Sequence, residues 1–259
     1  MILPSARAFA ILGLGLGFGL LMPAHGVAGE LPLDNLGADP AVKKIARAQI
    51  EAALAADPKN YDLRIKLGAL LCDIATDSDD SNSEHASDAA LALFKDFYAE
   101  APNDPEVRAF YGSACTIHAE YVFLFFKPGW ADKGFAHLDA AVAAAPDNVN
   151  VRLIRALNSS EVPSILGRDK VAREDFAWLL LRRESHPEEF SPVIQRALYF
   201  YAGRYALLRE DPTCLDLLTK AAAIPGDSPL NPKIQTALLQ ARAKFATEPN
   251  HPTLASHHA

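Results

Sequence analysis

The segment APDNVNVR, residues 145–152, decides how this chain folds, because the same arrangement occurs three times. Residues 57–64 read DPKNYDLR and residues 101–108 read APNDPEVR, which places a proline at positions 58, 102 and 146, each 44 residues after the last. The arginine that ends each segment recurs a fourth time, giving the series Arg64, Arg108, Arg152 and Arg196. A fixed period of this length indicates a chain built of repeated structural units.

Each of these prolines separates two helical patterns. Alanine-rich stretches such as LDAAVAAA precede it, and a cluster of Asn and Asp that can cap a new helix follows it. Beyond the cap, apolar residues recur at helical spacing, as at Leu63, Leu67, Leu70, Leu71 and Ile74. No stretch alternates in the manner of a strand. We therefore expect an all-α fold of about ten helices in five hairpins.

The units resemble tetratricopeptide (TPR) repeats, whose closing proline matches positions 58, 102 and 146. The small residues that let the two helices of such a repeat approach each other match Ala46, Ala53, Gly68, Ala90, Gly112, Gly134, Ala141 and Ala156. The resemblance implies a right-handed α-solenoid that binds a protein or peptide in the groove lined by the first helix of each pair. Repeats of this family usually run about 34 residues, so each unit here carries about ten more, which the alignment places between its two helices.

The resemblance also implies which residues of the three full units face the groove. They are Asp62, Ile65, Ala69 and Asp73, then Glu106, Ala109, Ser113 and Ile117, then Asn150, Leu153, Leu157 and Glu161. This mixed lining with small residues suits an extended peptide or a partner helix.

The repeated arginines occupy a position where the family most often has a large apolar residue. They would either form a ladder of positive charge facing an anionic peptide or ligand, or lie along the helix pair and ion-pair with neighbouring acids. We favour the second arrangement. In the third unit Arg152 shares a helix face with Arg155, and Glu161 and Arg168 lie near both in sequence.

The extra residues of the units differ in chemistry, and insertions in a solenoid often form a binding edge. The first insert, TDSDDSNSEHASD (76–88), follows the spacing of a calcium-binding EF-hand loop at Asp77, Asp79, Ser81, Ser83 and Asp88. Asn82 stands in place of the turn glycine and an aspartate in place of the bidentate glutamate, so we expect an ordinary solvated loop. The third insert, NSSEVPSILGR (158–168), is a mixed turn that ends at Arg168.

The second insert, EYVFLFFKPGW (120–130), is aromatic and carries Tyr121, Phe123, Phe125, Phe126 and Trp130. Large exposed apolar patches are rare in soluble monomers, so we expect these side chains to fold back and be buried. The alternatives are a partner surface or ligand pocket, and contact with a membrane.

Residues 1–28 have the pattern of a secretory signal peptide. Arg7 precedes an apolar run, and Gly26 and Ala28 fit the small positions of a cleavage site. The run is shorter than the roughly 20 residues that span a bilayer. We therefore predict cleavage after Ala28 and a periplasmic or secreted protein without membrane contact, with retention of the segment as an anchor as the alternative.

The remaining chain divides into a linker (29–39), the TPR-like helical repeat domain (40–246) and a flexible tail (247–259). The tail carries His251, His257 and His258. Although three histidines can bind a transition metal, we expect a frayed terminus.

Other residues limit the function. The net charge of −7 argues against a nucleic-acid partner. Cys72 and Cys115 fall on neighbouring helices, whose axes lie about 8–10 Å apart, whereas a disulfide needs Cα atoms within about 7 Å, so we expect free thiols. His118 and His137 are lone residues on helical stretches, which we interpret as packing residues.

No nucleotide-binding loop, metalloprotease helix or nucleophile elbow occurs after residue 28, so we predict neither an enzyme nor a cofactor. The sequence favours an exported protein-interaction module or scaffold of the bacterial cell envelope. The alternative is a periplasmic carrier of a small ligand or metal, using the repeated arginines and the aromatic insert as its pocket.

Overall fold

The computed structural model describes residues 38–77, 82–162 and 164–245. This part of the chain forms ten α-helices and two short 3-10 helices, and no strand occurs in it, which confirms the predicted all-α class. The helices are α1 Pro40–Ala56, α2 Tyr61–Ala75, α3 Ser83–Glu100, α4 Pro105–His118, α5 Lys127–Ala144, α6 Val149–Ser160, η1 Ser164–Leu166, α7 Asp169–Ser185, η2 Pro187–Glu189, α8 Pro192–Leu208, α9 Cys214–Ala223 and α10 Asn231–Phe245. The predicted signal segment and the histidine-containing tail lie outside the described residues.

The starts of α2, α4 and α6 reproduce the 44-residue period, because each is set by a capping side chain at the same repeat position. Asn60, Asp104 and Asn148 each accept hydrogen bonds from backbone N–H groups of the first helical turn. The fourth unit departs from the period, since α8 begins after Ser191, which caps it in the same way. The capping residues thus explain why the repeat is visible in the sequence.

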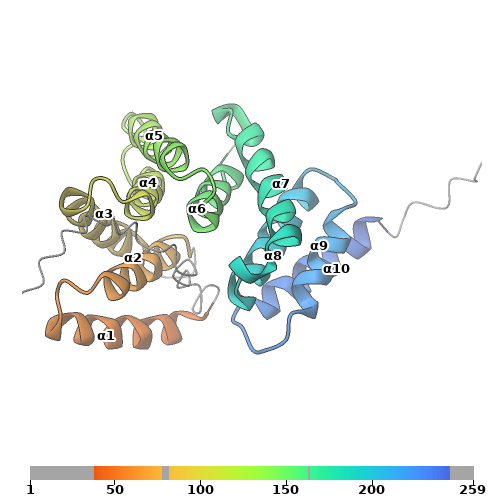
Figure 1. The fold of residues 1–259 in the computed structure, drawn as a ribbon, viewed down its shortest axis with the longest axis horizontal. Coiled ribbons are helices and arrows are strands. Elements are labelled where there is room, and N and C mark those ends of the chain that lie inside the picture. Colours follow the sequence, from red (N-terminus) through yellow and green to blue (C-terminus); the bar gives the residue numbers. More distant parts are fainter. Residues whose placement is uncertain (1–37, 78–81, 163, 246–259) are drawn as a thin grey trace, which may run out of the picture.

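The helices pack as consecutive hairpins, α2 with α3, α4 with α5, α6 with α7 and α8 with α9 (Figure 1). Helices α2, α4, α6 and α8 also contact one another in that order, so every second helix belongs to one layer and the intervening helices pack onto it. One hydrophobic core runs from α2 to α8, and a smaller one joins α8, α9 and α10.

The tightest hairpin is α4–α5, where two glycines let the backbones touch. A Cβ atom on Gly112 would lie 2.8 Å from the carbonyl oxygen of Gly134, and one on Gly134 would lie 2.7 Å from the carbonyl oxygen of Gly112. In the first hairpin Gly68 instead makes room for the ring of Phe94. The small residues of the repeat therefore determine how closely its helices pack.

The extra residues of each unit do not all lie in loops. In the first two inserts, residues 83–88 belong to α3 and 127–130 to α5, and in the third insert residues 158–160 belong to α6. The expectation that the whole insert separates the helices is therefore corrected, because part of each insert lengthens one of the two helices. Among the described helices, none has both the length and the apolar composition needed to cross a membrane.

Candidate binding site

Arg64 points from α2 to the end of α3, inside its own hairpin. The buried side chain donates hydrogen bonds to both carboxylate oxygens of Glu100, at 2.8 and 3.3 Å, and its guanidinium lies 3.8 Å from the ring centre of Phe97. These hydrogen bonds hold the pKa of Glu100 below its ordinary value. The residue joins two helices and does not face an open groove.

Arg152 and Arg155 meet at one buried carboxylate of α7. Asp175, which is 0% exposed, accepts a hydrogen bond from Arg152 at 2.9 Å and two from Arg155 at 2.7 and 2.8 Å. Arg155 also donates to Asp139 of α5 at 3.2 Å, and Arg168 donates two hydrogen bonds to the same carboxylate at 2.9 and 2.8 Å. Burial alone would raise the pKa of Asp139, but Arg168 and Arg155 hold this pKa below its usual range. Three predicted site residues thus form an internal ion-pair network between α5, α6 and α7.

Arg196, the fourth arginine of the series, has carbonyl groups as its partners. Its side chain is 4% exposed, and Nη2 donates to the carbonyl oxygens of Ile224, Pro225 and Gly226 at 3.0, 2.9 and 3.0 Å. These carbonyls follow the end of α9, where backbone acceptors lack helical partners. Arg196 therefore closes the C-terminal end of a helix.

Arg108 differs from the other three, because no described carboxylate or carbonyl oxygen accepts a hydrogen bond from its guanidinium. Nη2 donates to Oη of Tyr98 at 3.1 Å, and the buried Nε has no hydrogen-bond partner. The position equivalent to Glu100, 44 residues later, is Ala144. Helix α7 ends 41 residues after α5, which makes Gly134 the position equivalent to Asp175. The second unit therefore retains the arginine and lacks both acids.

Five of the twelve predicted groove positions are buried between the first helices, and five more are half-buried. Ile65, Ala109, Ser113, Asn150 and Leu153 are each at most 8% exposed. The apolar members belong to the main core, which means that the layer of first helices packs on itself at these positions. They contribute to stability here and present little surface to a partner.

Two of the charged groove positions form ion pairs within the chain, whereas Asp62 is exposed. Asp73 lies 2.9 Å from Nζ of Lys43, a buried lysine of α1 that also contacts Asp77 at 2.9 Å. Glu161 lies 3.4 Å from Arg204 of α8, and so is not part of the Arg152–Arg155 network. These pairs connect helices.

Glu106 is the groove residue with the most perturbed titration. Burial, with a further contribution from the negative charge of Asp104, raises its pKa to about 7, and Asn150 donates a hydrogen bond to it at 3.4 Å. A carboxyl group in this state is partly protonated near neutral pH.

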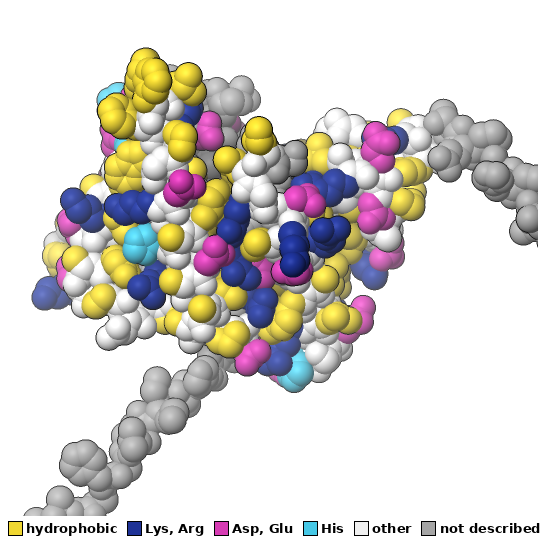
Figure 2. All heavy atoms as spheres, turned by 90° about the horizontal axis from the view of Figure 1, so that it is seen from above, with side chains coloured by type: hydrophobic (Ala, Val, Ile, Leu, Met, Phe, Trp, Pro, Cys, Tyr) yellow, Lys and Arg dark blue, Asp and Glu magenta, His cyan; other side chains and the backbone are white. Residues whose placement is uncertain are grey.

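The burial predicted for the second insert is wrong for its phenylalanines. Phe123, Leu124, Phe125 and Phe126 are 64–81% exposed, and we call these four residues the aromatic tip. The connection is too short to fold back, because a backbone hydrogen bond of 2.8 Å from Phe126 to Phe123 closes it into a turn. Tyr121 does fold inward, where its hydroxyl donates to the carbonyl oxygen of Ala75. Figure 2 shows hydrophobic side chains gathered at a projecting end of the face it presents, over the half of the molecule that holds α3, α4 and α5.

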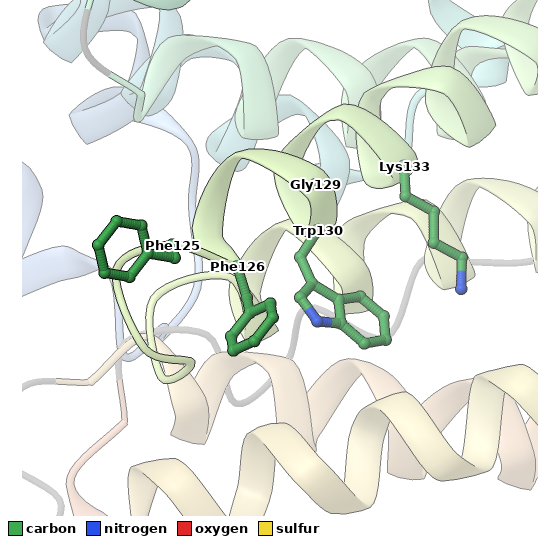
Figure 3. Close-up of a pocket in the computed structure, with 5 residues that line it drawn as sticks. All are labelled: Phe125, Phe126, Gly129, Trp130 and Lys133. Carbon is green, nitrogen blue, oxygen red and sulfur yellow. The ribbon is translucent and has the colours of Figure 1, made fainter.

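A shallow pocket lies beside the aromatic tip. It has a volume of about 280 Å³ and is lined by Phe125, Phe126, Gly129, Trp130 and Lys133. Phe126, Trp130 and Lys133 project from the same side of α5, whereas Phe125 turns away (Figure 3). A Cβ atom on Gly129 would meet nothing within 4 Å, so the space above this glycine is open.

The pocket continues into a row of residues along one face of α5. Phe126, Trp130, Lys133 and His137 are spaced by four, three and four residues, the spacing of a single helix face, and we call them the α5 strip. Lys133 Nζ lies 4.8 Å from the ring centre of Trp130.

Two tyrosines from neighbouring helices pack against the far end of the α5 strip. The ring of His137 lies 4.8 Å from that of Tyr111 and 5.1 Å from that of Tyr98. Tyr98 is also the residue that Arg108 contacts, with the guanidinium 5.6 Å from the ring centre. The α5 strip therefore runs from apolar at the tip to cationic beside Arg108.

At this end of the α5 strip, no described acid neutralises the positive charges of Arg108 and Lys133. Burial, followed by the positive charges of Arg108 and Lys133, lowers the pKa of His137. A hydrogen bond with Tyr111 raises the pKa of Lys133, which keeps the ammonium group charged. No described carboxylate is within ion-pairing distance of any of the three.

Among the residues of this surface, the sequence predicts the aromatic ones and Arg108, but not Lys133, Tyr98 or Tyr111. His137, which it predicts as a packing residue, lies against both tyrosines. The helical spacing from Phe126 to His137 was readable in the sequence, whereas the tyrosines come from two other helices and need the tertiary structure.

The described residues test the metal and thiol predictions in part. Two members of the EF-hand-spaced set, Asp79 and Ser81, lie outside the described residues, and Ser83 donates to the carbonyl oxygen of Asp77 at 2.7 Å. Across 38–77, 82–162 and 164–245, no group of three or more His, Cys, Asp or Glu could hold a metal ion. Cys72 and Cys115 are buried free thiols, as predicted.

No protein-family model, curated protein or solved structure matches this chain. The resemblance to TPR repeats therefore stays a prediction from the residues at the repeat positions.

Proposed function

We propose that this chain is an exported, TPR-like repeat protein of the bacterial cell envelope, a right-handed solenoid of helical hairpins that binds a protein partner. The observation that carries the proposal is the aromatic tip, four consecutive large apolar side chains that are 64–81% exposed. Contiguous exposed apolar surface marks interaction sites in soluble proteins, because its exposure to water is unfavourable unless a partner covers it. The 44-residue spacing of helix starts and caps supports the repeat architecture.

The partner would bind at the edge that carries the second insert and not in the groove. Most of the groove positions are core side chains or members of internal ion pairs, as at Leu153 and Asp73. Arg64, Arg152 and Arg155 are engaged by acids of their own unit. The aromatic tip and the pocket beside it have no such internal partners.

The alternative of a small-ligand carrier has less support. A carrier of this kind needs a pocket formed by the repeated arginines together with the aromatic insert. None of these arginines lines the pocket beside Gly129. The volume of about 280 Å³ also lies at or below the low end of the roughly 300–1,000 Å³ of ligand pockets.

Site-specific photo-crosslinking in intact cells tests the proposed function. A photoreactive amino acid replaces Phe125 of the aromatic tip or, as a control of similar exposure, Leu208 at the end of α8. We expect a discrete protein adduct from position 125 and none from position 208. Equal adducts from both positions, or none from position 125, contradict the proposal.

A further inference from the structure

We propose that the α5 strip recognises an acidic segment of a partner protein, with one large apolar side chain in the pocket beside Gly129 and a carboxylate beside Lys133, His137 and Arg108. The inference rests on the proposed function, since it names the chemistry that the partner presents at the same edge. It adds a binding site for an anionic group to a surface that the sequence indicates only as aromatic.

The first argument is charge complementarity. The chain holds 32 acidic against 25 basic residues, and yet the cations Arg108 and Lys133 lie against Tyr98 and Tyr111 without any described acid in ion-pairing distance. The repeated arginines of the first and third units are neutralised by Glu100 and Asp175. A carboxylate from a partner would supply Arg108 with the acid that the second unit lacks.

The second argument is the size and position of the pocket. A volume of about 280 Å³ is small for a whole ligand and suits a single anchoring side chain. Aromatic walls from Phe126 and Trp130 favour an apolar group, and the open space above Gly129 lets the backbone of a peptide approach α5 closely.

The geometry of α5 sets the spacing of the recognised groups. Lys133 and His137 follow Gly129 by four and eight residues, which at about 1.5 Å per residue places them about 6 and 12 Å along the helix. An extended peptide covers about 3.3 Å per residue, so the acid lies about two to four residues from the apolar anchor. The expected motif is therefore a large apolar residue with an aspartate or glutamate two to four positions away.

The first step of the test is selection of peptides on the purified protein from a random twelve-residue display library. We expect the recovered peptides to share a leucine, phenylalanine or tryptophan with an aspartate or glutamate at the stated spacing. Recovery of peptides without acid enrichment, or of no peptides, overturns the inference.

The second step measures the affinity of one recovered peptide through the fluorescence of Trp130, in a Trp178→Phe background that leaves one tryptophan. The double variant Arg108→Gln/Lys133→Gln and the single variant Gly129→Leu should each weaken binding at least tenfold. Two controls should stay within twofold: Lys66→Gln/Lys233→Gln, which removes two exposed lysines elsewhere, and Gly129→Ala, which leaves most of the pocket open. Equal loss in the lysine control would show that only net charge matters and would contradict a specific site.

The crosslinking and peptide results together, with a vesicle-binding assay, distinguish the failure of this inference from the failure of the proposed function and from membrane contact. A protein adduct at position 125 without acid preference in the peptides leaves the proposed function intact and removes the anion site. Absence of any protein adduct removes both. Co-sedimentation with phosphatidylcholine vesicles that Phe125→Ser abolishes, together with failure to recover peptides, would assign the aromatic tip to a lipid surface instead.

Discussion

The second and third units of this protein carry the same arginine in opposite surroundings. In the third unit Arg152 and Arg155 share the fully buried carboxylate of Asp175. In the second unit Arg108 has only the hydroxyl and ring of Tyr98, and an alanine and a glycine occupy the two positions from which the acids would come. The comparison shows that the period fixes where an arginine lies, whereas its role depends on whether a neighbouring helix supplies an acid.

The largest effect is expected from removing the acid of the third unit. Asp175→Ala takes from two partly buried arginines the buried carboxylate that they share, and breaking a buried ion pair typically costs about 3–5 kcal/mol. Urea unfolding at neutral pH measures the loss. A change below about 1 kcal/mol would show that the network is not structural and would remove the contrast between the units.

In the second unit, the carboxyl group of Glu106, which has no described ion-pair partner, should make stability depend on pH. The pKa of Glu106 is raised from 4.5 to about 7, so the folded state binds more protons than the unfolded state between these values. Stability therefore falls as pH rises from about 4.5 to about 7, by on the order of 3 kcal/mol.

The control for this slope is Glu106→Gln, which keeps the shape of the side chain. The variant should be more stable than the parent protein at pH 8 and should lack most of the decrease. Parallel curves of unfolding free energy against pH for the two proteins would exclude Glu106 as the source.

A smaller loss is expected from separating the two helices of the second unit. In Gly112→Ala the new Cβ atom meets the Gly134 carbonyl at 2.8 Å and Cγ of Leu138 at 2.9 Å, and such overpacking costs about 1–3 kcal/mol. Gly129→Ala, in open space on the same hairpin, should instead stabilise by up to about 1 kcal/mol through helix propensity. Thermal unfolding of both variants checks the signs, and a destabilised Gly129→Ala would show that the pocket is not open.

The smallest effect on stability and the sharpest on binding should come from restoring the missing acid. Ala144 stands where the first unit has Glu100, at the end of the second helix and exposed. Ala144→Glu should pair with Arg108, change stability by less than about 1 kcal/mol and weaken binding of acidic peptides. Peptide titration of Ala144→Glu beside Ala144→Gln isolates the charge. Equal affinities of the two variants would mean that Arg108 takes no part in binding.

The all-α class and the starts of the helices were predictable because their signals are local. Asn60, Asp104 and Asn148 cap helices at a fixed period, and the glycines at 112 and 134 mark the helix contact. These features depend on residues close in sequence or on the repeat itself.

The site was only half predictable because its partners come from other helices. The acids that engage Arg64 and Arg152 lie 36 and 23 residues away, at separations that the period does not give. Burial was the wrong expectation for Phe125, since a short connection closed by its own backbone hydrogen bond leaves its side chains no path to the core.

The most direct test of the account compares two arginines of the same series. Urea unfolding of Arg152→Gln and Arg108→Gln, measured side by side, reports what each contributes to the fold. The account predicts a loss of at least about 2 kcal/mol for Arg152→Gln, because hydrogen bonds to a buried charge are lost. It predicts a loss below about 1 kcal/mol for Arg108→Gln, which gives up no ion pair. Equal losses in the two variants would contradict the claim that the acid, and not the repeat position, decides the role of the arginine.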